Sequence, residues 1–197
     1  MKGRPYIKYF VIVLLAIILD QSTKLLVYFN MEMGSAGQIK ILGDWFKLHY
    51  TLNPGMAFGI QFGFKYGKIL LTLGRIFATI FIFDHIYKES IKSENYSKES
   101  LFAWSFIAGG AIGNVIDCIF YGVYLGNAPY LSPFKWLHGQ VIDMILIDLY
   151  SIRMPDWVPY YGGLYYRSFP IFNIADCFIT LGVSMLLIKN WKKKVEN

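Results

Sequence analysis

The sequence predicts an all-α integral membrane protein with four transmembrane helices and a small extracytoplasmic cap that contains β-strands. The 197-residue chain is 55% hydrophobic and only 16% charged, and its mean hydropathy is +0.41. A soluble domain usually carries roughly a quarter charged residues. Four apolar runs are also long enough to cross a bilayer as helices, which takes about 20 residues. We therefore expect a single membrane-embedded domain over residues 1–197.

Four stretches are the predicted spans, and they cover residues of about 6–29, 68–87, 101–125 and 172–191. The first stretch resembles a secretory signal peptide, since cationic residues precede its apolar core. No convincing small-residue cleavage site follows that core, and three further spans come after it. We therefore expect the first stretch to be a retained helix.

Lysine and arginine residues gather on one side of the predicted membrane layout. They lie before the first span, between the second and third spans and after the fourth: Lys2, Arg4, Lys8, Lys88, Lys92, Lys98, Lys189, Lys192, Lys193 and Lys194. Cytoplasmic segments carry such an excess, so both termini are expected in the cytoplasm. The net charge of +6 lies in short clusters beside apolar runs and not on a basic face with stacking aromatics. This distribution argues against a nucleic-acid partner.

The two connections on the opposite side, of about residues 30–67 and 126–171, are the predicted cap. The first contains IKILGDWFKLHYTLN, whose alternating apolar and polar residues predict one or two short strands. The second is rich in aromatic residues, which favour the headgroup layer. They are Tyr130, Trp136, Trp157, Tyr160, Tyr161, Tyr165, Tyr166 and Phe169. We expect this cap to rest on the outer leaflet.

Polar residues recur at helical spacing within or beside the spans. Asp20 and Lys24 are four residues apart and can neutralise each other on one helix face. Two further pairs are three residues apart: Asn114 with Asp117, and Asn173 with Asp176. Such residues most often form hydrogen bonds between membrane helices, and the small-residue surface of Gly109 and Gly113 supports that reading for part of the set. Together, however, they indicate a polar site near the outer leaflet.

Asp143 and Asp176 are the leading candidates for catalysis. Both lie in apolar sequence beside or within predicted spans, in GQVIDMI and IFNIADCF. An ionised carboxylate is costly there and is rarely retained without a task. Two carboxylates placed close together are forced into different protonation states, so one can activate water while the other donates a proton.

Other kinds of site find little support in the sequence. Cys118 and Cys177 lie in apolar stretches without ligand spacing, so we expect small buried side chains. The three histidines, His49, His85 and His138, make no metal-binding pattern, and neither HExxH nor GxSxG occurs. We interpret His138 as a loop histidine, with support of the site as the alternative. Asp84 and His85 are expected to face the cytoplasmic headgroups.

Five segments in order resemble the bacterial lipoprotein signal peptidase family, also called signal peptidase II. They are DQSTK at 20–24, NPGMAFG at 53–59, GGAIGNVID at 109–117, GQVIDM at 139–144 and FNIAD at 172–176. With the four-span layout, the resemblance covers most of the chain.

The resemblance implies an aspartic endopeptidase of the bacterial cytoplasmic (inner) membrane that uses two aspartates and no metal or other cofactor. Such an enzyme removes the signal peptide of a lipid-modified prolipoprotein by cleaving before the diacylglyceryl cysteine. Prolipoproteins and membrane phospholipid would be its partners, and we expect a monomer. The catalytic aspartates match Asp143 and Asp176. Residues expected to support the site or bind substrate are Asp20, Lys24, Asn53, Gly55, Asn114, Asp117, Asn173 and Ala175.

The chain departs from the family pattern in three places. The family usually has arginine after the aspartate matched by Asp117, and here Cys118 stands there, so the expected ion pair is missing or supplied elsewhere. Met56 stands where alanine is commoner. The segments on either side of Asp143 are longer than usual, which leaves Asp148 as a competitor, although VIDM fits the motif better than LIDL does.

Two other readings of the sequence make different predictions. A small transporter or assembly factor would line a polar path with the same residues and show no proteolysis, and Asp20 and Asp117 would then matter as much as Asp143. Presenilin-like and prepilin peptidases are also membrane aspartic proteases, but they use a GxGD motif that this sequence lacks.

Overall fold

The computed structural model describes residues 7–55, 66–91, 97–158, 162–163, 165–167 and 169–196. Several residues discussed above lie outside these ranges: Lys2, Arg4, Met56, Lys92, Tyr160 and Tyr161. Among the described residues, four helical segments are long and apolar enough to cross a membrane: 7–30, 67–89, 98–124 and 174–195. Their positions agree closely with the four predicted spans.

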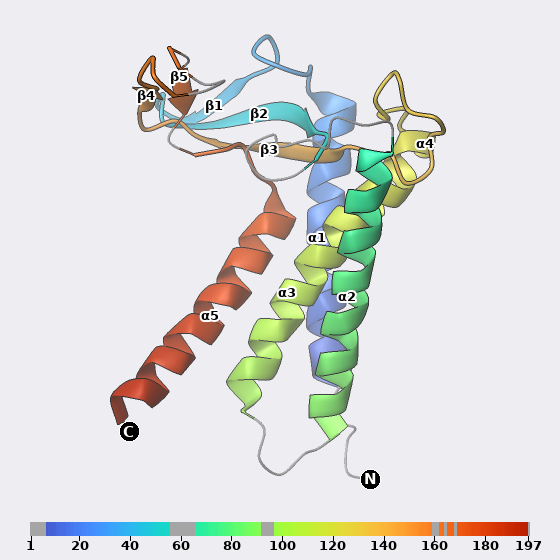
Figure 1. Ribbon diagram of the computed structural model, residues 1–197, viewed down its shortest axis with the longest axis vertical. Helices are drawn as coiled ribbons and strands as arrows, with labels where there is room; N and C mark the ends of the chain where they lie inside the picture. The colour runs from blue at the N-terminus through green and yellow to red at the C-terminus, as the bar shows by residue number, and fades with distance from the viewer. Residues whose placement is uncertain are drawn as a thin grey trace.

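The helices form the lower layer of the molecule in Figure 1 and the strands form a cap above them. Helices α1 (Ile7–Asn30), α2 (Gly67–Ile91) and α3 (Lys98–Ile116) lie together, and α5 (Ile174–Glu196) packs against α3, from Gly110 near the cap to Ala103 near the far end. The ribbon of α3 continues into a π-helical turn, η2 (Asp117–Tyr121), and a short helix, α4 (Gly122–Tyr124).

The cap holds a three-stranded antiparallel sheet in the order β1-β2-β3. These strands are β1 (Ile39–Leu42), β2 (Phe46–Asn53) and β3 (Val141–Ile147). A second, two-stranded sheet pairs β4 (Ser151–Arg153) with β5 (Tyr165–Arg167). The predicted strands of the first outer connection are therefore confirmed as β1 and β2, whereas those of the second connection were not predicted.

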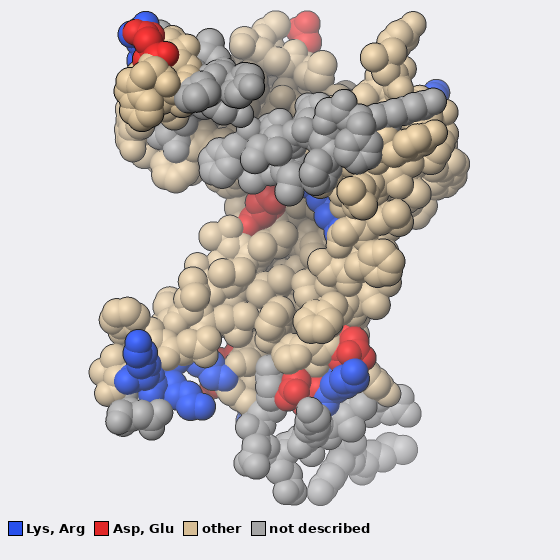
Figure 2. Space-filling model, in the orientation of Figure 1, with Lys and Arg blue, Asp and Glu red and all other residues tan. Residues whose placement is uncertain are grey.

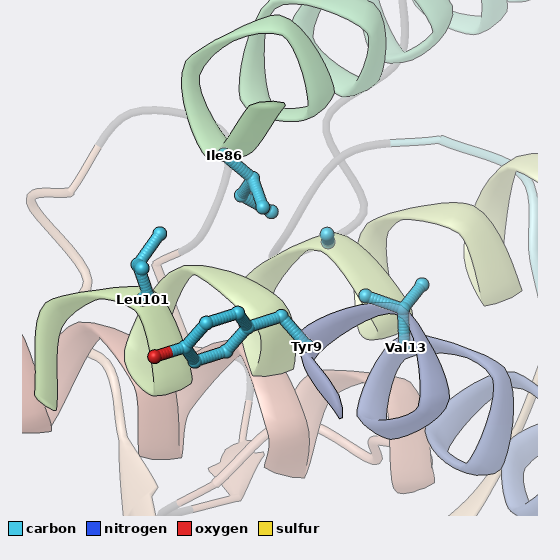
Figure 3. Packing of buried hydrophobic residues seen from close by; sticks show 5 residues of the cluster. Tyr9, Val13, Ile86 and Leu101 are labelled. Carbon is cyan, nitrogen blue, oxygen red and sulfur yellow. The ribbon is translucent and has the colours of Figure 1, made fainter. Parts of the chain in front are cut away.

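The apolar core of the bundle lies where α1, α2 and α3 meet, at the end opposite the cap. Tyr9, Val13, Ile86, Leu101 and Ala108 form one buried cluster there, four of which are labelled in Figure 3. Burying such side chains stabilises the bundle by roughly 1.5–3 kcal/mol each in water, and between helices in lipid the gain comes mainly from close packing.

Glycines let α3 approach its neighbours more closely than any other residue would. A Cβ on Gly109 would touch Ala16 of α1, and one on Gly110 would meet the backbone and side chains of α5. The small-residue surface predicted at Gly109 and Gly113 is thus a packing surface, and it brings the polar residues of three helices together near the cap.

Charged residues separate the molecule into zones (Figure 2). Lysine and arginine gather at the end away from the cap, where α5 carries Lys192 and Lys193 and α2 carries Lys88 paired with Asp84. Between this end and the cap the surface is almost entirely uncharged, as expected for a membrane-facing belt.

Candidate active site

The FNIAD segment builds the start of α5 as a reciprocal cap. The Asn173 side-chain oxygen accepts a hydrogen bond from the backbone N–H of Asp176 at 3.0 Å, and the Asp176 carboxylate accepts one from the backbone N–H of Asn173 at 3.3 Å. This is the geometry of a capping box, in which both partners satisfy otherwise free helix donors. It fixes the Asp176 carboxylate in the first helical turn, where the helix dipole favours negative charge.

Asp143 comes to the same place from the sheet. Strand β3 pairs with β2 so that Thr51 lies opposite Asp143 and Asn53 lies opposite Val141. Residues two apart on a strand share a face, so Asn53 and Asp143 are diagonal neighbours. The Asn53 Nδ2 donates to Asp143 Oδ2 at 3.1 Å. Asp143 is only 2% exposed.

The other edge of β3 is tied to the start of α5. Phe172 exchanges backbone hydrogen bonds with Ile145, and its carbonyl also accepts from the N–H of Met144. This short bridge places Asn173 directly beside the strand that carries Asp143. Because both attachments are made by backbone groups, the relative position of the two aspartate-bearing elements is set by the fold itself.

Asparagine amides connect the two aspartates. Asn173 Nδ2 donates to Asp143 Oδ1 at 2.7 Å and to Asn114 Oδ1 at 3.2 Å. Asn114 Nδ2, from α3, donates to Asp176 Oδ1 at 3.0 Å. Asp143 and Asp176 therefore share one hydrogen-bonded network and line the same cavity.

The electrostatic setting of Asp143 favours its neutral form. Burial first, and then the negative charge of Asp176, raises the pKa of Asp143 to about 7, against an opposing effect of the amides of Asn53 and Asn173. Two neighbouring carboxylates with one raised pKa are the arrangement expected when a proton is shared between them. Near neutral pH, this carboxyl group therefore exchanges its proton readily.

A buried ion cluster supports the network from below. Lys24 of α1 lies 2.8 Å from Asp20 and 2.8 Å from Asp117, and it also donates to Asn114 at 2.9 Å. All three charged side chains are fully buried. The lysine thus orients Asn114, whose amide then faces Asp176.

The same cluster joins four elements, α1, η2, α5 and β3. Asp20 accepts the backbone N–H of Ala175 at 2.9 Å, and Asp117 accepts that of Ile142 at 3.3 Å. Asp20 thereby holds the start of α5, and Asp117 holds β3 next to Asp143. Removing one partner of such a cluster would leave an uncompensated buried charge, which is strongly destabilising.

The aspartates open onto a cavity of about 730 Å³. The described walls of the cavity include the pair of aspartates Asp143 and Asp176, called the dyad below, and the Phe169–Phe172 segment. One face of α5 completes them, where Thr180 and Ser184 follow Asp176 at helical spacing. Most of the lining is apolar, and the polar groups converge at the dyad. This combination is typical of sites that bind a mostly apolar molecule and fix one polar part of it.

All ten predicted site residues lie in the described part of the chain and meet at this network or directly beside it. Gly55 contributes its N–H to Asn53 Oδ1 at 3.0 Å, and Ala175 contributes its N–H to Asp20. The competitor Asp148 lies elsewhere, just beyond the end of β3, and pairs with Lys47 at 3.0 Å. The VIDM assignment is therefore the one that brings two aspartates together.

Three residues that contact this network were not predicted. Gln21 Nε2 donates to Asp20, Asp117 and the Gly113 carbonyl, and Tyr121 donates to Gln21 Oε1 at 2.8 Å. Arg75 of α2 reaches the cavity wall. A polar Gln21 beside Asp20 in an apolar span was a usable signal. Arg75, a charged residue inside the apolar span of about residues 68–87, gave the same kind of signal, whereas Tyr121 gave none because its partner is distant in sequence.

The remaining candidates play no part in this network. His138 is buried, with Nδ1 at 3.0 Å from the Trp136 carbonyl. Asp84 pairs with Lys88 at the end of α2 that lies away from the cap. Cys118 is buried as expected, but Cys177 is exposed and lines the cavity, so the prediction of a buried Cys177 was wrong. Its place beside Asp176 in the first turn of α5 turns it toward the opening.

Comparison with known proteins was made by sequence and by structure. A family model described as signal peptidase (SPase) II matches residues 12–192. A lipoprotein signal peptidase of Amoebophilus asiaticus is 58% identical over 181 residues, which cover 92% of this chain and 76% of that protein. A lipoprotein signal peptidase of Porphyromonas gingivalis is 35% identical over 187 residues, covering 90% and 80%.

Two solved structures, both described as bacterial membrane enzymes, share the fold. One has a TM-score of 0.59 at 26% identity and covers 92% of this chain and 91% of that chain. The other has a TM-score of 0.63 at 24% identity and covers 96% and 91%. The arrangement of four helices with a small sheet at one end is thus a known membrane-enzyme architecture.

Proposed function

Because the chain belongs to the signal peptidase II family, we propose that Asp143 and Asp176 form its catalytic pair and cleave the peptide bond before a diacylglyceryl-modified cysteine. The protein is a membrane aspartic endopeptidase that removes signal peptides from prolipoproteins. The observation that carries the proposal is the asparagine network through Asn173 and Asn114, which connects the two carboxylates across one cavity.

The two aspartates have different roles in this mechanism. Asp176, in the first turn of α5, accepts a proton from the attacking water. Asp143, whose pKa is raised to about 7, holds a proton and donates it to the departing amine. After one turnover Asp176 holds a proton and Asp143 is ionised. Transfer of that proton from Asp176 to Asp143 restores the starting state.

Three asparagine side chains hold the two aspartate carboxylates in position. Asn53 and Asn173 hold the two oxygens of Asp143, and Asn114 holds Asp176. An amide donor aimed at developing negative charge is worth about 3 kcal/mol in other hydrolases. Here the amides are already engaged with the carboxylates, so their main contribution is to orient the acids before substrate binds.

The cavity supports a lipid-modified substrate. From Asp176 it continues along α5 past Thr180 to Ser184, in the direction of the membrane interior. An acyl chain or an apolar signal peptide can lie along this face while its polar cysteine region remains at the dyad. We propose that the enzyme works as a monomer in the bacterial inner membrane, surrounded by phospholipid, with both termini in the cytoplasm and no nucleic-acid partner.

The test is cleavage of one precursor with and without diacylglyceryl on its cysteine, using purified enzyme and mass spectrometry of the products. We expect cleavage of the lipidated precursor alone, with lipidated cysteine as the new N-terminus. The unlipidated precursor, which lacks the part that fills the apolar cavity, should remain intact. Equal cleavage of both forms, or no cleavage of either, would contradict the proposal.

A further inference from the structure

Arg75 places a guanidinium group in the wall of the apolar cavity. It lies on α2, one of the helices long and apolar enough to cross a membrane, and its side chain is half-buried. No carboxylate lies within ion-pair distance of it among the described residues. A charged side chain at this depth is costly and is rarely retained without a task. Figure 2 shows an acidic and a basic patch on the same face, at the height where the helices meet the cap.

Arg75 donates two hydrogen bonds that together fix its guanidinium group. Its Nη2 donates to the Gly55 carbonyl at 2.6 Å, and its Nη1 donates to Cys118 Sγ at 2.9 Å. The planar guanidinium can hold both at once because its donors point in fixed directions. A lysine, with a single ammonium group on a flexible stem, lacks this two-ended geometry.

A continuous set of hydrogen bonds leads from Arg75 to Asp143. Gly55 accepts from Arg75 through its carbonyl and donates through its N–H to Asn53 Oδ1 at 3.0 Å. Because the Asn53 oxygen is thereby engaged, its Nδ2 faces Asp143 Oδ2 at 3.1 Å. Without the anchor at Gly55, the Asn53 amide would lose the contact that sets which of its two ends points at the carboxylate.

Cys118 accounts for how an arginine from α2 reaches this place. The resemblance noted above leads one to expect an arginine at position 118, on η2. Here the small Cys118 side chain is fully buried, and the Arg75 guanidinium rests against it. Lys68 also lies 3.9 Å from Cys118 Sγ. An arginine at 118 beside Arg75 and Lys68 would bring three cations together, so Cys118 and Arg75 fit each other.

We propose that Arg75 is a positioning residue of this peptidase, which supplies from α2 the arginine absent at position 118 and holds the Gly55 turn so that Asn53 fixes Asp143. The inference rests on the proposed function, since it assigns Arg75 a role only through Asp143. It concerns the rate of the chemical step and not the binding of substrate.

The first experiment measures kcat and KM of Arg75→Leu with a lipidated precursor. We expect kcat to fall about 10- to 100-fold, because a small misplacement of a catalytic group has an effect of this size, while KM changes less than about threefold. Arg75→Lys should retain an intermediate kcat. A normal kcat with a raised KM would show that Arg75 binds substrate instead, and would overturn the inference.

The double variant Arg75→Leu/Asn53→Ala tests whether Arg75 acts through Asn53. If it does, the double variant should lose no more kcat than the more impaired single variant, since both remove the same contact to Asp143. Losses that multiply would show independent roles and contradict the proposal. Both single variants should also move the alkaline limb of the rate profile to higher pH, because loss of the Asn53 donor raises the pKa of Asp143.

The charged surroundings define what this pH shift reports. Asp176 faces Asp143 from α5 and Lys24 acts on it from α1, whereas Arg75 has Lys68 on its own helix and Cys118 from η2 as neighbours. Of these groups, only Arg75 differs between the wild-type enzyme and Arg75→Leu, and none differs in Asn53→Ala.

The variant Arg75→Ala/Cys118→Arg keeps the proposal testable if the single variants are unstable. It removes the arginine from α2 and restores one at 118, so kcat should exceed that of Arg75→Ala severalfold. Cys118→Arg alone should be impaired by crowding of cations. A double variant no more active than Arg75→Ala would contradict the proposal that Arg75 replaces an arginine at position 118.

Arg153→Leu is the matched control, since it removes an exposed arginine that pairs with Asp156 in the cap. It should retain kcat. The proposed function and this inference fail separately: an active Asp143→Asn enzyme would refute the catalytic pair, whereas an active Arg75→Leu enzyme with an inactive Asp143→Asn enzyme would refute the role of Arg75 alone.

Discussion

At the scale of single residues, Asn173 does more than its place in a helix cap requires. Its oxygen caps α5, its backbone N–H meets Asp176, and its amide nitrogen holds Asp143. One fully buried side chain thus joins the sheet and the helix that carry the two acids. The fold holds the carboxylates through neutral amides, which orient them without fixing either in its charged form.

The pH dependence of turnover follows from the raised pKa of Asp143. The group is the proton donor in the mechanism, and it loses that proton as the pH rises through about 7. We therefore expect kcat to fall about tenfold per pH unit above this value and to level off as the pH drops below it. Rates measured from pH 5 to pH 9 test this, and an unchanged kcat between pH 7 and pH 9 would contradict it.

The proposed catalytic residues stand out in the sequence because their local settings are distinctive. Asp143 and Asp176 stand out as acids in apolar sequence, and Asn173 with Asp176 has the spacing of a capping box. Tyr121 could not be predicted, since its partner Gln21 is distant in sequence and no local spacing marks it, whereas the charge of Arg75 inside an apolar span was a signal that the sequence offered. Cys177 was wrongly placed because its apolar neighbours said nothing of the cavity beside it.

At the scale of elements, the site depends on how closely α1, α3 and α5 approach. Gly113 of α3 faces Asp20, and a Cβ there would overlap the Asp20 carboxylate, which also holds Lys24 and Ala175. Helix α3 therefore needs a residue without a side chain at position 113. The buried ion cluster and the start of α5 occupy the space that a side chain would need.

Gly113→Ala should destabilise the protein, and Gly74→Ala is its control. Overpacking at Gly113 should cost about 1–3 kcal/mol and displace Asp20 from Ala175, so activity should fall too. Nothing lies within 4 Å of a Cβ on Gly74, so alanine there should be neutral or stabilise α2 by up to about 1 kcal/mol. Thermal unfolding in detergent measures both, and equal midpoints for the two variants would refute this account of α3.

The strand that carries Asp143 shows where element prediction failed. VIDMILI in β3 has no alternation of apolar and polar residues, because most of its side chains are buried. A short apolar run of this kind cannot be told from a buried helix by periodicity. By contrast, β1 is exposed along its length and β2 is mostly half-buried, so polar residues occur among their apolar ones. The four spans were found because their length and apolar composition are diagnostic.

At the scale of the whole molecule, charge is arranged along one axis. The cap and the two aspartates lie at one end, a cluster of lysines lies at the other, and a largely uncharged belt lies between them (Figures 1 and 2). Such an arrangement sets the orientation of a membrane protein, because positively charged segments remain in the cytoplasm. We therefore propose that the basic end lies in the cytoplasm and that Asp143 and Asp176 lie at the outer surface.

Reporter fusions to the C-terminus test this orientation. A fluorescent protein that folds in the cytoplasm should be bright when joined after α5, and alkaline phosphatase at the same place should be inactive. Insertion of phosphatase into the cap near Gly43, in the turn between β1 and β2, should give the reverse. An active phosphatase at the C-terminus would contradict the orientation but not the fold.

The measurement that tests the central claim most directly is kcat of Asp143→Asn, Asp176→Asn and the double variant on a lipidated precursor. Two acids that share one water act as a unit, so each single change should abolish nearly all turnover and the double change should add little. Folding should be preserved, because asparagine keeps the size of each side chain. Near-normal turnover in either single variant, with normal insertion, would show that the pair is not the catalyst.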